Sequence, residues 1–525
     1  MFLMTVKKIS NETGNAALDL ALDTLKIGKQ ALVFVNTKRS AEKTAEDIAK
    51  KVKGNSKNLV ELSDKVLKAL SSPTKQCKRL SNCLQKGIAF HHAGLVAKQR
   101  ELIEDNFRNG AIKIICATPT LAYGLDLPAF RAILKDLRRF GHRGMMYIPV
   151  LEYLQMSGRA GRPKFDKFGE AIIVAVSENE KKKLYKKYVL GEPEDIYSKL
   201  AVEPVLRTYL LSLIAANFVN TKKGIVEFFG RTFWAFQFVD MEKLVLIIDK
   251  MLNLLEEWEF IQMDSKEDFT NADKIENDNE KIKATLMGKR VAELYIDPLT
   301  AYFFITCFRN ASDKKTAEFS FLQMISHTLE IRPLLRVGAR EQEKIQEEFV
   351  KHYDLLLEKE PSMYELEYED FFNSIKTALM LCEWINEKTE ENLLEDFSAR
   401  PGELKSKLNI ADWLLYASEE ISRLLHYQYL NKEIVKLRLR LKNGVKEELL
   451  PLVKIKGIGR VRARRLFVNR IRDIGDVKKA DLVKLIQILG KQVALNAKKQ
   501  VGQEQKEVPL GKRKGQISLL KDYHE

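Results

Sequence analysis

Residues 31–52, "ALVFVNTKRSAEKTAEDIAKKV", join a short apolar run to a helical pattern. The run at 31–35 is rich in apolar and β-branched residues, which is typical of a buried strand. The polar stretch that follows has the composition and spacing of a helix on a protein surface. A buried strand followed directly by such a helix is the repeating unit of an α/β layer.

The same unit recurs along the first part of the chain. "GIAFHHAG" at 87–94 is followed by the helical "AKQRELIEDNFRNG", and "IKIICAT" at 112–118 leads into "PTLAYG". A last apolar run, "EAIIVAVS" at 170–177, closes the series. Strands alternating with helices indicate an α/β domain with a mostly parallel sheet, which we place at residues 1–190.

Beyond Gly191 and Pro193 the pattern becomes mainly helical, so the predicted fold is α/β followed by mainly α. Residues 191–297 read as helices closing on a short β segment, the pattern of a winged helix. Residues 298–430 place apolar residues three and four apart almost throughout, as in a helical bundle. Residues 431–525 are basic and helical and end in a Lys- and Gln-rich tail.

The composition restricts the class of protein. The 525 residues are 45% hydrophobic and 30% charged, enough for several folded cores. No stretch approaches 18 uninterrupted apolar residues, and the N-terminal lysines follow a very short apolar run, unlike a secretory signal. We therefore expect a cytoplasmic protein with no membrane partner. The five cysteines include no C-x-x-C pair, so neither a zinc site nor a disulfide framework is predicted.

The positive charge is concentrated near the C-terminus. The net charge is +16, and residues 432–472 alone hold 14 Lys and Arg against 3 Asp and Glu. Such an excess favours a polyanion such as nucleic acid, although a solvated helical surface has the same composition. Inside it lies "IKGIGRVRARRL" (455–466), where Gly457 and Gly459 allow backbone N–H groups to approach a phosphate. This helix-hairpin-helix pattern predicts a grip on the DNA backbone, with charge from Arg460, Arg462, Arg464 and Arg465.

A second phosphate-binding pattern is "EYLQMSGRAGRP" at 152–163. Arg159 and Arg162 are three residues apart and on a helix would share one face. Each guanidinium is a planar fork of donors suited to phosphate. "ATPTLAYGLDLPA" at 117–129 lies upstream, and "FHHAGL" and "ALVFVNTKRSAEKTA" lie upstream again.

In this order and spacing these segments resemble motifs IV, V and VI of superfamily-2 helicases. More narrowly they are similar to the Ski-like DExH branch, and most to the archaeal Hel-type DNA repair helicases. The resemblance covers essentially the whole chain. It implies a second RecA-like motor domain, a winged helix, a helical ratchet domain and a helix-hairpin-helix, in that order.

The resemblance also implies a role for each motif residue. Arg159 and Arg162 would reach ATP phosphates, with Gln155 and Gly158 beside them. Gly124 and Asp126 would link the nucleotide state to the grip on the strand, although most members carry Asn where this chain has Asp126. Thr118 and Thr120 would offer hydroxyls to the DNA backbone. His91 and His92 are expected to pack and hydrogen-bond locally, and no metal site is predicted.

Two aromatic features could touch DNA. "RRFGHRGMMYIP" (138–149) reads as a hairpin, which in the resembling helicases wedges the duplex apart; here Phe140 and Tyr147 would stack on the end pair. A plain surface hairpin is the alternative.

In "IADWLLYASEEISR" (410–423), Trp413 would stack on bases of the unwound strand, or would be an ordinary core tryptophan. The family's ratchet arginine maps to Ser406, with Lys405 and Lys407 as substitutes.

The motifs of a first RecA-like motor domain are absent from these residues. No Gly-Lys pair fits G-x-x-x-x-G-K-[ST], and no Asp is followed by Glu. ATP and Mg²⁺ would therefore be held mainly by a first RecA-like domain outside this chain. A split gene with a separate partner chain, a fragment, or a stand-alone DNA-binding remnant would each explain this.

The sequence thus predicts the C-terminal part of an ATP-dependent 3′–5′ DNA helicase that acts on single-stranded and forked DNA in repair. It would be inactive alone because the Walker A and DExH motifs are absent. The alternatives are a non-catalytic DNA-binding module and an exosome-associated Ski-like RNA helicase; the helix-hairpin-helix favours DNA. The tail residues Gln516, Leu519 and Tyr523 loosely resemble a sliding-clamp or single-strand-binding-protein motif, or form a solvated tail.

Overall fold

The computed structural model describes residues 9–53, 56–70, 72–123, 126–141, 144–162, 166–200, 202–238, 241–263 and 281–502. The chain divides into two compact units. The sheet unit comprises Met1–Ser198 together with Glu390–Lys407, and the helical unit comprises Lys199–Thr389 and Leu408–Glu525. A segment distant in sequence therefore belongs to the sheet unit, which the sequence did not predict.

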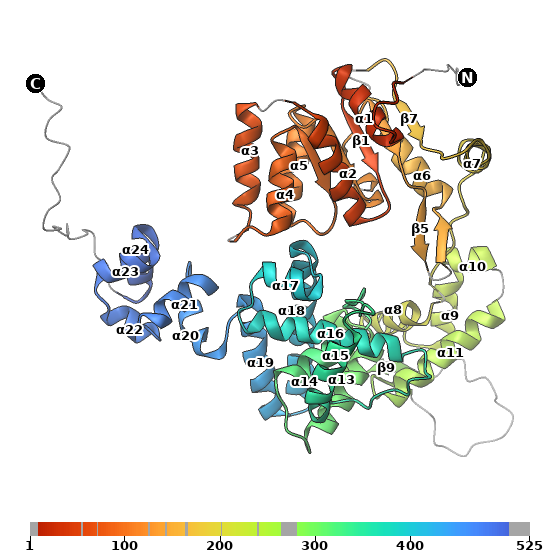
Figure 1. The fold of residues 1–525 in the computed structure, drawn as a ribbon. Coiled ribbons are helices and arrows are strands. Elements are labelled where there is room, and N and C mark those ends of the chain that lie inside the picture. The colour runs from red at the N-terminus through yellow and green to blue at the C-terminus, as the bar shows by residue number, and fades with distance from the viewer. Residues whose placement is uncertain are drawn as a thin grey trace, which may run out of the picture. The chain divides into compact units, whose positions relative to one another are not determined.

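The sheet unit is built on five parallel strands in the order β2-β3-β1-β4-β7. Their bounds are β1 (Ala31–Phe34), β2 (Ile88–His91), β3 (Ile114–Ala117), β4 (Arg131–Leu134) and β7 (Glu170–Ile173). Helices α1 (Ala16–Lys26), α2 (Lys38–Lys51), α4 (Lys75–Leu84), α5 (Ala97–Arg108) and α6 (Val150–Ser157) pack along these strands (Figure 1). The predicted parallel α/β layer is confirmed.

The central strands explain why the sequence folds this way. Every residue of β1, β2, β3 and β4 is buried, as the apolar runs predicted. Because the strands are parallel, their carboxyl ends share one edge of the sheet and their amino ends share the other. Residues that follow the strands and residues that precede them are therefore gathered at two separate places.

Two further elements complete the sheet unit. The strands β5 (Arg138–Gly141) and β6 (Gly144–Tyr147) pair in antiparallel register, so the hairpin predicted at 138–149 is confirmed. Between β1 and β2 the chain also forms α3 (Lys57–Leu67), which packs against α4. Helix α7 (Glu178–Leu184) and the turn Tyr185–Val189 follow β7.

A fully buried arginine ties the edge of the sheet to the first helix. Arg131 on β4 donates from Nε to Glu170 on β7 (2.7 Å) and from Nη1 to Asp23 on α1 (2.9 Å). Its side chain is 0% exposed, whereas those of Asp23 and Glu170 are 21% and 25% exposed. Removing one partner of a buried pair leaves the remaining charges without compensation.

Replacing Arg131 by methionine is therefore expected to lower the local unfolding free energy by about 3 kcal/mol. Native-state hydrogen exchange of the β4 amides measures this value. The matched control is Lys181→Met, because Lys181 and Glu178 form an exposed pair (67% and 78%) worth less than about 1 kcal/mol. Equal protection in the two variants would contradict the structural role of Arg131.

The helical unit begins with a small group that contains the only strands described outside the sheet unit. Its elements are α8 (Glu203–Ala215), α9 (Lys222–Gly230), α10 (Phe233–Phe238), α11 (Met241–Glu257), β8 (Ile261–Met263), β9 (Ile282–Ala284) and α12 (Leu286–Leu294). Strands β8 and β9 are antiparallel, and α8 packs on α11 and α12. This agrees with helices closing on a short β segment, while the winged-helix assignment stays a prediction.

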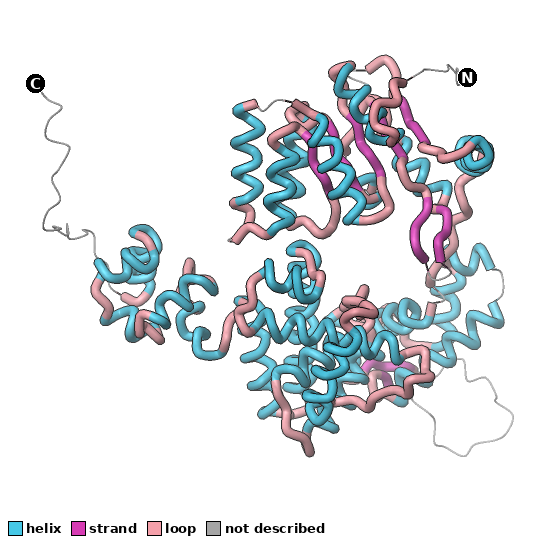
Figure 2. The backbone as a smooth tube through the Cα atoms, viewed as in Figure 1, coloured by secondary structure: helices cyan, strands magenta, loops and turns pink. Residues whose placement is uncertain are grey.

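The rest of the helical unit consists, in its described residues, of helices joined by loops, with no strand, as Figure 2 shows. Its longer helices are α13 (Pro298–Ala311), α14 (Glu318–Ser326), α15 (Gln342–His352), α16 (Tyr368–Ile385), α18 (Pro401–Leu424) and α19 (Gln428–Asn443). Helix α18 crosses the boundary between the units: its residues up to Lys407 group with the sheet unit, as does α17 (Glu390–Phe397). No single described helix is long and apolar enough to cross a membrane; only the sharply bent pair α12 and α13 passes that test together.

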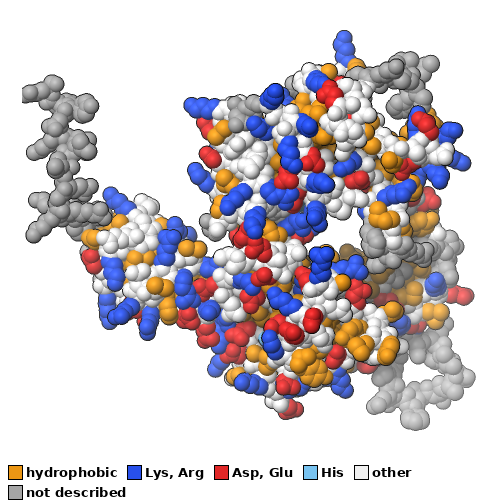
Figure 3. All heavy atoms as spheres, viewed as in Figure 1, with side chains coloured by type: hydrophobic (Ala, Val, Ile, Leu, Met, Phe, Trp, Pro, Cys, Tyr) orange, Lys and Arg blue, Asp and Glu red, His pale blue; other side chains and the backbone are white. Residues whose placement is uncertain are grey.

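A C-terminal module of short helices follows α19. It comprises α20 (Leu450–Val453), α21 (Arg460–Val468), α22 (Ile474–Lys479), α23 (Leu482–Leu489) and α24 (Lys491–Gln500). Its apolar residues form a hydrophobic cluster of their own that includes Leu452, Leu466 and Leu485. Lys and Arg side chains are spread over the visible face of this module (Figure 3). Residues 450–500 of the predicted basic helical region therefore belong to a folded module with its own core.

Candidate functional sites

A cavity of about 870 Å³ lies at the amino edge of the sheet. It is lined by residues that precede the strands: Gln30 before β1, Gly110 before β3, Asp126 before β4, and Gly158 to Arg162 before β7. Arg108, Arg159 and Arg162 give it a positive wall. The predicted phosphate-binding pair is thus brought together with Asp126 and Gly158 in one concave site.

The two arginines do not share a helix face, so that expectation is wrong. Helix α6 ends at Ser157, and Gly158 is its C-cap. Gly161 then takes a φ of +95°, a left-handed conformation that favours glycine, and turns the chain. Ala129 fixes this loop, since its N–H donates to Arg159 O (2.9 Å) and its carbonyl accepts from Gly161 (2.6 Å). Backbone pairing, rather than helical spacing, sets Arg159 beside the segment that contains Asp126.

Arg162 is held by partners that the sequence analysis did not identify. Its Nε donates to Asp166 (2.7 Å) and its Nη1 to Gln30 (2.5 Å). The Asp166 side chain is 1% exposed and also pairs with Lys29 (2.7 Å). The hydrogen bond from Arg162 holds the pKa of Asp166 below its usual value despite burial, so this carboxylate stays charged. The spacing of four residues between Arg162 and Asp166 was a sequence signal for their ion pair. Nothing in the sequence indicated the contact between Arg162 and Gln30.

Arg159 is only partly satisfied. It donates through Nη2 to the carbonyl of Ala122, but its Nε is buried and has no hydrogen-bond partner among the described residues. Gln155, four residues earlier, has a buried Oε1 that also lacks a partner within the described chain. Gln155 is not among the residues that line the amino-edge cavity. A buried donor without a partner is costly, which suits a site that a phosphate oxygen completes.

The cavity fits phosphate better than a metal ion. Within the part of the chain that the structure describes, no group of three or more His, Cys, Asp or Glu side chains could hold a metal. The guanidinium groups that line the cavity suit a phosphate group. Gly124, predicted to act with Asp126, lies outside the described residues.

A second cavity, of about 560 Å³, lies at the opposite, carboxyl edge of the same sheet. It is lined by residues that follow the strands: Asn36 and Thr37 after β1, Ala93 after β2, Thr118 and Thr120 after β3, and Asp136 after β4. The Thr118 and Thr120 hydroxyls lie 2.9 Å apart, and both residues line the cavity. Ligands of open parallel sheets bind at this edge.

The two histidines beside this cavity are structural, as expected. His91 Nε2 lies 2.9 Å from Glu104, and the fully buried His92 lies 3.2 Å from Glu42 and stacks on Phe90. Burial lowers the pKa of His92, so its ring is neutral.

The hairpin presents apolar and aromatic side chains. Met145 and Met146 on β6 are 58% and 43% exposed. Tyr147 lies under the guanidinium of Arg138, 4.5 Å from its ring centre, and its hydroxyl accepts a hydrogen bond from the same residue. The Phe140 side chain lies outside the described residues. Exposed methionines on a short hairpin are compatible with contact to a base pair, but this role stays a prediction.

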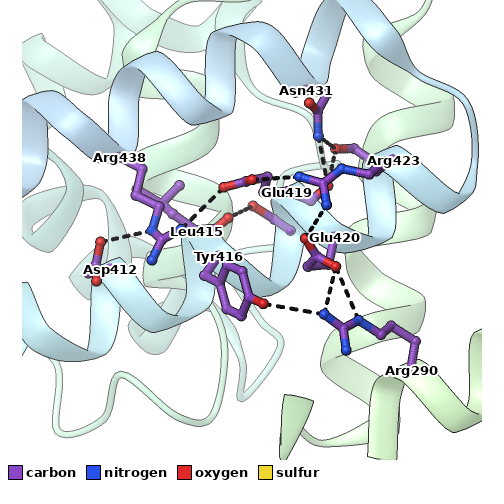
Figure 4. Close-up of polar contacts among 11 residues, drawn as sticks. Arg290, Asp412, Leu415, Tyr416, Glu419, Glu420, Arg423, Asn431 and Arg438 are labelled. Atoms are coloured by element: carbon purple, nitrogen blue, oxygen red, sulfur yellow. Dashed lines mark hydrogen bonds and ion pairs between the residues drawn. The ribbon is translucent and has the colours of Figure 1, made fainter. Parts of the chain in front are cut away.

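Trp413 is half-buried and tethered within the helical unit. Its indole Nε1 donates to the carbonyl of Leu294 at the end of α12 (3.0 Å). Figure 4 shows ion pairs made by other residues of α18: Arg290 of α12 reaches Glu420 (2.6 Å), and Arg438 of α19 reaches Asp412 (2.9 Å). The tether fixes the edge of the ring that carries the N–H.

The two lysines proposed to replace the ratchet arginine differ. Lys405 is exposed, whereas Lys407 is buried, with 7% exposure. Burial lowers the pKa of Lys407 to about 8. Lys405 is therefore the more accessible of the two for a DNA phosphate.

The arginines of the C-terminal module are mostly engaged with protein. Arg464 makes two hydrogen bonds to Glu387 at the end of α16, and Arg460 lies 4.5 Å over the Trp384 ring. Arg462 is exposed and donates only to the carbonyl of Gly457. Gly457 makes the expected tight turn, with a φ of +95°, and Gly459 caps α21. Gly457 thus forms a tight turn before α21, and Arg462 and Arg465 are the exposed arginines of the motif.

Comparison with known proteins identifies the family. Residues 15–164 match the model "Helicase conserved C-terminal domain", and residues 319–444 match "Archaeal helicase, domain 4". The chain is 38% identical to the ATP-dependent DNA helicase Hel308 of Pyrococcus abyssi over 521 residues, which is 97% of this chain and 69% of that protein.

Two further relatives carry the same name. Identity to the Hel308 of Pyrococcus horikoshii is 38% over 485 residues, covering 91% of this chain and 64% of the relative. Identity to that of Methanococcus vannielii is 36% over 510 residues, covering 91% and 66%. The chain thus spans about two thirds of the length of these relatives. It belongs to the Hel308 family of Ski-like superfamily-2 DNA helicases.

Proposed function

We propose that this chain forms the C-terminal part of an ATP-dependent 3′–5′ DNA helicase that unwinds forked or branched DNA during repair. The observation that carries the proposal is the presence of two cavities at opposite edges of one sheet. The amino-edge cavity offers Arg159 and Arg162, and the carboxyl-edge cavity offers Thr118 and Thr120. A sheet that contacts a nucleotide at one edge and a nucleic acid at the other can couple nucleotide binding to nucleic-acid binding.

At the amino edge, Arg159 and Arg162 would hold phosphate oxygens of ATP. The unpartnered Nε of Arg159 would gain an acceptor, and Arg162 would exchange Asp166 and Gln30 for the phosphate. Guanidinium forks aimed at a transferring phosphoryl group stabilise the charge that develops on it. The remaining phosphate and Mg²⁺ contacts would come from a P-loop domain, because these 525 residues contain no P-loop pattern.

At the carboxyl edge and in the helical unit, single-stranded DNA would be held without reading of its sequence. The Thr118 and Thr120 hydroxyls suit phosphate oxygens, and Trp413 suits a stacked base. In this proposal α8–α12 with β8 and β9 is a winged helix, and α20 and α21 with the Gly457 turn form the helix-hairpin-helix. A clamp or single-strand-binding protein at residues 516–523 stays a prediction, because these residues lie outside the described chain.

Reconstitution tests the proposal. ATP hydrolysis is measured with and without single-stranded DNA, first for this chain alone and then after adding a separately expressed domain from a Hel308-family protein that carries the P-loop and D-E-x-H motifs. We expect no turnover from this chain alone and DNA-stimulated turnover from the pair. An inactive pair whose larger chain still binds DNA tightly would favour the non-catalytic binding module. Stimulation by RNA but not DNA would favour the RNA helicase.

A further inference from the structure

The segment Glu390–Lys407, called the strap below, docks on the sheet unit although it follows β7 by more than 200 residues. Its Gly402 N–H donates to the carbonyl of Gly94, in the loop after β2 (3.0 Å). A Cβ on Gly402 would lie 2.3 Å from Leu95 O and 2.4 Å from Ala93 O, so the backbones meet as closely as glycine allows. The strap is therefore seated on the loop that lines the carboxyl-edge cavity.

The strap adds a cation to that cavity. Arg400 lines it together with Lys38, Arg39 and Arg139. The stem of Arg400 lies over Gly94, where an added Cβ would be 2.4 Å from Arg400 Cδ. Gly94 thus leaves the space that this side chain occupies.

A buried carboxylate positions Arg400. Glu42 on α2, with a side chain 4% exposed, accepts from Arg400 Nε (3.3 Å), from Gln76 (2.8 Å) and from Arg79 (2.6 Å). Burial alone would raise the pKa of Glu42, but its neighbours His92 and Gln76 and the charge of Arg400 outweigh it and lower the pKa to about 2. Glu42 is therefore a permanent anion that fixes one side of the guanidinium.

The other side of the guanidinium faces an acidic residue of the strap. Arg400 Nη1 lies 4.0 Å from the Glu403 carboxylate, which is longer than a hydrogen bond. Glu403 also pairs with Lys38, another cation that lines the cavity. One carboxylate thus lies near two cations that a phosphate could bind.

We propose that Arg400 and Lys38 form a clamp for a phosphate of single-stranded DNA in the carboxyl-edge cavity, and that Glu403 competes with this phosphate for them. The inference rests on the proposed function, since it names additional residues for the same DNA site. The strap residue Arg400 lines the same cavity as Thr118 and Thr120, and Glu42 is a positioning residue. Single-stranded DNA would displace Glu403 and gain charge-assisted hydrogen bonds from both cations.

The test is fluorescence anisotropy of a labelled oligo-deoxythymidine with the whole chain over a series of KCl concentrations. Arg400→Gln is expected to weaken binding about fivefold and to reduce the slope of log K against log salt by about 0.7, one phosphate contact. Glu403→Gln is expected to strengthen binding about threefold, because it removes the competing charge. The matched control is Glu395→Gln, a strap residue that pairs with Lys75 and does not line the cavity. It should change affinity by less than half as much as Glu403→Gln.

Gly402→Ala provides an independent variant, since its Cβ would push the strap off the Gly94 loop. It should weaken binding as Arg400→Gln does, and the double variant should be no weaker than either alone. If Arg400→Gln bound DNA as tightly as the wild type, the clamp would be refuted although the chain binds DNA. The clamp would also be refuted if Glu403→Gln and Glu395→Gln changed DNA affinity equally. Absence of binding by the wild-type chain would instead overturn the proposed function itself.

Discussion

Replacing Arg162 by alanine is expected to reduce ATP turnover of the reconstituted helicase by about 10³-fold or more, with little change in single-stranded DNA affinity. An arginine that stabilises charge on the transferring phosphoryl group contributes about 10³ to 10⁵ in turnover. Arg162 lines the amino-edge cavity, at the opposite edge of the sheet from Thr118 and Thr120, so its removal leaves the DNA side unchanged. Steady-state hydrolysis and fluorescence anisotropy on the same preparations measure the two effects.

Two variants separate catalysis from folding at this position. Arg162→Ala also leaves Asp166, with a 1% exposed side chain, paired only with Lys29. Asp166→Asn removes the carboxylate that Arg162 contacts in this structure but keeps the Arg162 guanidinium. This variant should therefore retain most of the ATP turnover. Arg162→Lys keeps a charge but loses the planar fork, so its turnover should fall close to that of the alanine variant. If Arg162→Ala lost DNA affinity as strongly as it lost ATP turnover, the assignment of Arg162 to ATP would be refuted.

Replacing Trp413 by alanine is expected to weaken single-stranded DNA binding by about 1–3 kcal/mol, or roughly 5- to 150-fold. The reason is the loss of one base-stacking face. Binding is measured by anisotropy at fixed salt, and folding is checked by thermal unfolding of the same samples.

The tether to Leu294 requires its own control. Trp413→Phe keeps a stacking face but loses the indole N–H that donates to Leu294 O. If stacking matters, the phenylalanine variant should bind DNA nearly as well as the wild type. If both variants unfold earlier and neither binds DNA more weakly, Trp413 is a core residue that ties α18 to α12, and the stacking role is refuted.

The strand and helix patterns were readable from local sequence because they follow the burial of adjacent residues. The run at 31–35 became β1, and the alternation that follows it became the parallel sheet. The hairpin predicted at 138–149 is formed by β5 and β6. The expectation that Arg159 and Arg162 share a helix face was wrong, because residue spacing cannot reveal that Gly158 ends α6 and that Ala129 pairs with the following loop.

The sequence by itself determined the chemistry available to this protein: guanidinium forks at Arg159 and Arg162, hydroxyls at Thr118 and Thr120, and a basic C-terminal region. Only the tertiary structure decided which of these groups meet. It separated the arginines and the threonines to opposite edges of one sheet, and engaged Arg460 and Arg464 with the end of α16. It also returned Arg400 to the loop after β2. Residue type and spacing indicate local burial. The ion pair between Arg400 and Glu42 joins residues that are 358 positions apart, so it depends on how the whole chain folds back on itself.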